Sequence, residues 1–105
     1  MFRTAEVVVE FFPKEAGGRQ GPPWSNGYRY SPHFRVTNSS EFLGIEFVSG
    51  PDQVEFNVQY HAIARFLYEP NVSYEALIEG TEFEILEGPK VVGRGKIISR
   101  EELTS

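Results

Sequence analysis

Hydrophobic and polar side chains alternate with a period of two along much of the chain, which is typical of β-strands that cover a core on one face. Between residues 5 and 12 the odd-numbered positions are all apolar, whereas the even-numbered ones include two glutamates. The alternation recurs at 43–48, at 82–85 and at 91–98, where two glycines indicate a bulge or the close approach of another backbone. We therefore predict strands over these four segments.

The longest alternation covers residues 54–61, where apolar and polar side chains exchange for eight positions. We expect Phe56, Val58 and Tyr60 to face the core, because successive strand residues point to opposite faces. The polar residues Glu55, Asn57 and Gln59 should then face water. Helical spacing is suggested only at 71–78, so this segment is predicted to form one short helical turn.

Clusters of Gly, Pro, Asn and Asp separate these segments, and such clusters favour turns. The longest irregular stretch, residues 13–28, is expected to be a surface loop. The 105 residues are 40% hydrophobic and 24% charged, which suits one globular domain over 1–105 and is too short for two independent cores. About six short strands in such a chain predict an all-β, antiparallel barrel or sandwich.

The residues that catalysis requires are scarce. The chain has no Cys, which excludes disulfides, thiolate nucleophiles and Cys-based metal sites. Its single Asp, Asp52, lies in a Gly-Pro-Asp turn, whereas His33 and His61 lie in strand-like segments without a catalytic or metal-binding partner nearby in sequence. No phosphate-binding loop is present. We assign no catalytic residue, metal ion or cofactor, and expect a protein that is not an enzyme.

Charge weakens the case for nucleic acid as a general partner. The formal net charge is −5, and the ten Lys and Arg residues are scattered, whereas non-specific binding to phosphates needs clustered cations. No apolar run approaches the roughly 20 residues of a membrane helix, and the first residues do not have the pattern of a signal peptide. We therefore expect a cytoplasmic protein that does not enter a membrane.

Several motifs, taken in order, resemble the C-terminal β-barrel, the third domain, of translation elongation factor Tu. They are the loop Glu-Ala-Gly-Gly-Arg-Gln-Gly-Pro at 15–22, Gly-Tyr-Arg at 27–29, Phe-Arg-Val-Thr at 34–37 and the glycine-rich hairpin at 83–95. The similarity covers roughly residues 4–99. It implies a closed, six-stranded antiparallel barrel.

In that family the third domain has no catalytic role, packs against a GTPase domain and contacts the T-stem of aminoacyl-tRNA, partly through the loop that matches Glu87 and Gly88. Here Pro89 and Lys90 replace the family's Gly-Arg, and two extra residues precede Pro32. These departures put tRNA contact in doubt. The GTPase domain is not in this sequence, so the chain is not expected to bind GTP.

The leading functional interpretation is a non-enzymatic module that binds a protein partner. The irregular loop presents a Trp after a stiff Pro-Pro pair, so Arg19, Trp24, Tyr28 and Arg29 are its candidate contacts. The alternative is that Trp24 covers one end of the barrel, and that the two arginines bond loop carbonyls or pair with Glu15 and Glu87.

A second functional interpretation is RNA binding, in particular of a tRNA-like stem, through a local patch of the hairpin and loop. Its candidate contacts are Arg19, Arg29, Glu87, Gly88, Lys90 and Arg94. If these cations touch phosphates, binding should weaken as salt rises.

Overall fold

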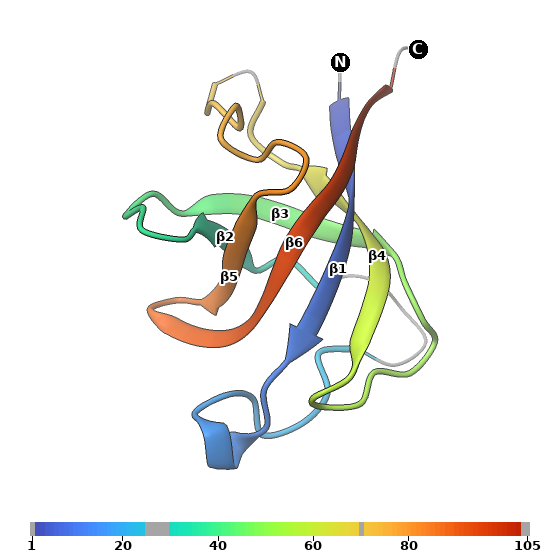
Figure 1. The fold of residues 1–105 in the computed structure, drawn as a ribbon, viewed down its shortest axis with the longest axis vertical. Helices are drawn as coiled ribbons and strands as arrows, with labels where there is room; N and C mark the ends of the chain where they lie inside the picture. The colour runs from blue at the N-terminus through green and yellow to red at the C-terminus, as the bar shows by residue number, and fades with distance from the viewer. Residues whose placement is uncertain (1, 25–29, 70, 104–105) are drawn as a thin grey trace.

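The computed structural model describes residues 2–24, 30–69 and 71–103, and these residues form an antiparallel barrel closed by six strands (Figure 1). The strand order around the barrel is β1-β4-β3-β2-β5-β6. This confirms the predicted all-β fold class. The strands are β1 (Phe2–Phe11), β2 (His33–Val36), β3 (Leu43–Ser49), β4 (Gln59–Phe66), β5 (Glu82–Glu87) and β6 (Lys90–Leu103).

The described ranges contain a single short helical element, the 3₁₀ turn η1 (Lys14–Ala16), which follows β1. No helix in these ranges has the length and apolar character needed to cross a bilayer.

The alternation read from the sequence places the core correctly in three strands, β1, β3 and β5. The inward side chains of β1, at Ala5, Val7, Val9 and Phe11, are essentially without solvent exposure. The apolar positions predicted for β3 and β5 are buried in the same way. Rings fill much of the interior, as expected from nine Phe residues.

Two glycines of β6 lie where another part of the chain comes very close, as predicted. A Cβ atom at Gly93 would lie 2.5 Å from the Glu10 carbonyl oxygen. At Gly95 it would lie 2.6 Å from both the Val8 carbonyl oxygen and the Phe83 ring. Side chains at these positions would force β6 away from β1, so glycine lets the barrel close tightly here.

The strand predicted over 54–61 is wrong for most of its length. Pairing of β4 begins only at Gln59, because Asn57 has φ of 62° and lies in a turn, which breaks the extended chain. Val58 is 39% exposed, and Phe56 is only half-buried. The predicted inward orientation is therefore wrong for Val58 but correct for Phe56 and Tyr60, which are partly buried against the core. The buried residues of β4 lie later in the chain, at Ala62, Ala64 and Phe66.

The helical turn predicted for 71–78 is also wrong, because its described residues form successive turns instead. Tyr74 and Leu77 are fully buried. The Tyr74 ring stacks on Phe66 at a centroid distance of 4.6 Å, and its hydroxyl donates to the Gly44 carbonyl at 2.5 Å. The spacing of apolar residues therefore reflects a loop that packs on the core, not a helix.

Candidate functional site

Arg19 is bound within the chain. Its guanidinium forms an ion pair with Glu87, donates to the Gly21 carbonyl at 2.9 Å, and lies over the Tyr30 ring. The Tyr30 hydroxyl donates to the same Glu87 carboxylate at 2.5 Å. Arg19 is thus engaged as the alternative interpretation expected, with a loop carbonyl and Glu87, so its charge is already compensated.

Burial and the neighbouring Glu87 carboxylate both raise the pKa of Tyr30. Burial is the larger cause, and together with the hydrogen bond to Glu87 it raises the pKa of the Tyr30 hydroxyl far above its usual value. The hydroxyl therefore remains a proton donor throughout the physiological pH range. This favours a structural bond over proton-transfer chemistry.

Trp24 covers one end of the barrel. Its side chain is 5% exposed, and its ring packs edge-on against Phe11 at 5.9 Å and beside Phe47 at 5.2 Å between centroids. The indole Nε1 donates to the Pro51 carbonyl oxygen at 2.8 Å. A Cβ at Gly50 would lie 2.9 Å from the ring, so the loop fits closely over it. The interpretation of Trp24 as an exposed anchor for a partner is therefore wrong.

The other residues predicted from the loop and hairpin are not all placed by the structure. Tyr28 and Arg29 lie outside the described residues. Gly88, with φ of 58°, forms the β5–β6 turn, and Lys90 is exposed at the start of β6. Arg94 lies further along the same strand, with its side chain 66% exposed. Gly88, Lys90 and Arg94 thus follow the hairpin turn and β6, whereas Glu87 ends β5 and Arg19 lies in the segment after β1.

Arginines of the described residues pair with glutamates from other strands or loops. Five arginines are paired in this way: Arg3 with Glu69 and Glu75, Arg19 with Glu87, Arg35 with Glu84, Arg65 with Glu46 and Arg94 with Glu10. A phosphate that approached one of these arginines would have to compete with a carboxylate already in place. The acidic residues thus reduce the cationic character of the barrel surface.

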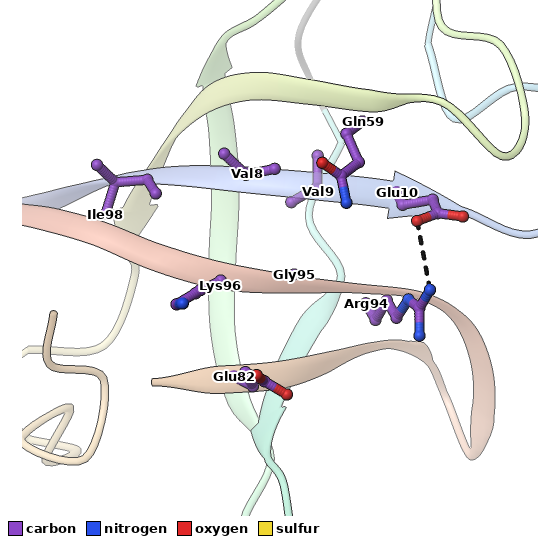
Figure 2. Close-up of a pocket in the computed structure, with 9 residues that line it drawn as sticks. All are labelled: Val8, Val9, Glu10, Gln59, Glu82, Arg94, Gly95, Lys96 and Ile98. Atoms are coloured by element: carbon purple, nitrogen blue, oxygen red, sulfur yellow. Dashed lines mark ion pairs between the residues drawn. The ribbon is translucent and has the colours of Figure 1, made fainter. Parts of the chain in front are cut away.

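A groove lies on the outer face of the barrel, over β1 and β6 (Figure 2). Its volume is about 390 Å³, near the lower end of the range of ligand pockets. Side chains from β1 and β6 form most of it, and β4 and β5 contribute one residue each. The residues used below are Val8, Glu10, Glu82, Arg94, Lys96 and Ile98.

A row of polar side chains forms one border of this groove. Strand register places Arg35, Glu84, Arg94, Glu10 and Gln59 side by side across five strands. Two contacts along this row are ion pairs, Arg35–Glu84 at 2.6 Å and Arg94–Glu10 at 3.6 Å. Opposite charges on neighbouring strands stabilise such a row. The border is therefore held in place without a partner.

Next to this row the surface is amphipathic. Val8 and Ile98 are half-buried aliphatic residues of the outer face, and Lys96 and Glu82 are exposed charges beside them. Sequence reasoning missed this site, although one signal was present. Val8 is apolar but occupies the polar face of β1, between two glutamates.

The lining of the groove offers side chains that can bind a ligand. It contains aliphatic, carboxylate, amide and cationic side chains, and no hydroxyl or imidazole group. Within the described ranges no three His, Asp or Glu residues are placed to hold a metal ion. No protein family model matches the chain.

Proposed function

We propose that the protein is a non-enzymatic module that binds a protein partner through the groove over β1 and β6. The observation that carries this proposal is the pair of half-buried aliphatic side chains, Val8 and Ile98, set among charged and amide groups. Contact surfaces of this kind exclude water at an apolar centre and use a polar rim for orientation. The groove also replaces the Trp24 loop as the partner-facing surface.

RNA binding is the competing function, with Lys90 and Arg94 as its exposed cations on β6. Two facts weigh against it. Arg94 contacts Glu10, and the chain carries a net charge of −5. RNA is therefore an alternative outcome of the experiment below.

We also propose that the chain is a relative of the third domain of elongation factor Tu. Support comes from the ordered motifs and from the closed six-stranded barrel, in which Gly93 and Gly95 allow the close strand contacts. Arg19 and Tyr30 both bind the carboxylate of Glu87, the residue that matches part of the family's tRNA-contacting loop. Because Glu87 is engaged within the chain, these contacts favour a function of the barrel other than tRNA binding.

The test is affinity capture from the native lysate, with and without nuclease. The compared proteins are the wild type, Lys96→Glu in the groove, and the matched control Lys14→Glu on η1. Lys96→Glu should lose a nuclease-resistant protein that the wild type and Lys14→Glu both retain. Retention of every captured protein by Lys96→Glu, or capture that nuclease abolishes, would contradict the proposal.

A further inference from the structure

Val8 of β1, Lys96 of β6 and Glu82 of β5 lie side by side in register, with Lys96 in the middle (Figure 2). We infer, building on the proposed function, that the groove receives an extended segment with an aliphatic, an acidic and a basic side chain in this order on one face. The acidic group pairs with Lys96 and the basic group pairs with Glu82. The aliphatic group packs on Val8 and Ile98.

Two charged residues of the groove form no ion pair within the described residues. Lys96 and Glu82 face each other in register across β5 and β6, and both are exposed. Within the described residues neither forms an ion pair, whereas Glu10 and Arg94 in the same groove already contact each other. A ligand that carries both charges can therefore bind without breaking an existing ion pair.

Ile98 supplies a second aliphatic side chain beside Val8. Ile97 is buried in the core, whereas Ile98 lies in the groove that Val8 also lines. Successive strand residues point to opposite faces, so Ile98 lies on the same outer face as Lys96. The aliphatic part of the groove therefore adjoins the Lys96 and Glu82 charges.

The groove is small, and a volume of about 390 Å³ suits a few side chains and not a folded surface. In an extended chain, residues two apart lie on the same face. The fitting segment therefore has aliphatic, acidic and basic residues at alternate positions, for example Ile-Thr-Glu-Thr-Lys.

The experiment titrates the protein with capped five-residue peptides and follows backbone amide chemical shifts. The probe is the Ile-Thr-Glu-Thr-Lys peptide. The matched controls replace Ile by Thr, or replace either charged residue, or both, by Gln. We expect shifts centred on β1 and β6 and an affinity that falls about two- to fivefold for each neutralised charge. Loss of the aliphatic residue should abolish saturation.

Two variants of the protein assign the contacts. The Lys96→Gln variant should bind the unmodified peptide and the peptide with Gln in place of Glu equally tightly, because the acidic side chain has lost its partner. The control variant Lys90→Gln changes another exposed lysine and should still bind the unmodified peptide more tightly than the peptide with Gln in place of Glu. Equal binding of the neutral and charged peptides to the wild type, or no saturable shift in the groove, would overturn the inference. The proposed function would remain if Lys96→Glu still lost its captured protein, so the two failures are distinguishable.

Discussion

Arg19 and Glu87 lie 68 residues apart in sequence and form an ion pair that joins the segment after β1 to the β5–β6 hairpin. Tyr30 donates to the same carboxylate. The three side chains thus connect two chain segments beside the end that Trp24 covers. Partly exposed ion pairs contribute little, about 0.2–1 kcal/mol each, so this contact mainly fixes the position of the loop.

The Arg19–Glu87 contact predicts a small but measurable coupling. Arg19→Ala and Glu87→Ala should each lower the free energy of unfolding, and the double variant should lose less than the sum. We expect a coupling of about 0.5–1 kcal/mol in a double-mutant cycle by urea unfolding. Arg94→Ala combined with Glu87→Ala is the control, and these two changes should be additive. A coupling of zero for the first pair would show that the contact is unimportant in solution.

Tyr30 predicts that alkaline pH destabilises the fold. Its pKa is raised in the folded protein, so the folded state holds the proton when the unfolded state has begun to release it. Stability from Tyr30 is complete below about pH 10, the ordinary tyrosine pKa, and is lost as pH rises above it. The loss approaches about 1.4 kcal/mol per pH unit for one proton. Urea unfolding between pH 8 and about pH 11.5 measures it.

Tyr30→Phe is the control for this pH dependence, since it keeps the ring and removes the ionisable group. Burial also raises the pKa of Tyr74, so this variant should retain part of the alkaline loss. The slope should therefore be reduced but not abolished. An unchanged slope would contradict the assignment to Tyr30.

Burial of Trp24 predicts that this residue stabilises the fold. Trp24→Ala should lower the free energy of unfolding by about 3–5 kcal/mol, because it empties a ring-sized space and leaves the Pro51 carbonyl without its donor. The wild-type fluorescence should be blue-shifted and poorly quenched. Phe42→Ala, at a residue that is 40% exposed, is the control and should cost far less. Similar melting temperatures for the two variants would contradict the placement of Trp24.

The close packing around Gly95 predicts that a larger residue at this position destabilises the fold. Gly95→Ala should destabilise the protein by about 1–3 kcal/mol, because the new Cβ would collide with the Val8 carbonyl and the Phe83 ring. Gly21→Ala is the matched control, since nothing lies within 4 Å of its Cβ position and its φ is not positive. Thermal unfolding of both variants decides the point. Equal stability would mean that β6 does not approach β1 as described.

The fold was predictable from the sequence where one face of a strand is buried and the other is solvated. In β1 that condition holds, and the alternation ending at Phe11 marks the core residues correctly. It fails at 54–58, where the pattern alternates but the backbone turns at Asn57. Alternation reports which side chains are apolar, and it does not show whether backbone hydrogen bonds to a neighbouring strand exist.

The candidate site was predicted less well, for a related reason. Composition suggested that Trp24 and Arg19 face a partner, but tertiary contacts to Pro51 and Glu87 decide their roles. The groove depends on which strands lie side by side and in what register, and no local pattern of this chain specifies either. In the sequence, the groove was indicated only by Val8, an apolar residue on the polar face of β1.

The central claim is that a protein partner docks on the outer face of β1 and β6. Its most direct test is photo-crosslinking in native lysate, with p-benzoylphenylalanine in place of Val8 in one sample and in place of Val48 in another. Val48 is 40% exposed on β3, which is not adjacent to β1 or β6 in the barrel order. We predict a nuclease-resistant protein adduct from position 8 and none from position 48. Equal adducts from both positions, or an adduct to RNA alone, would contradict the account.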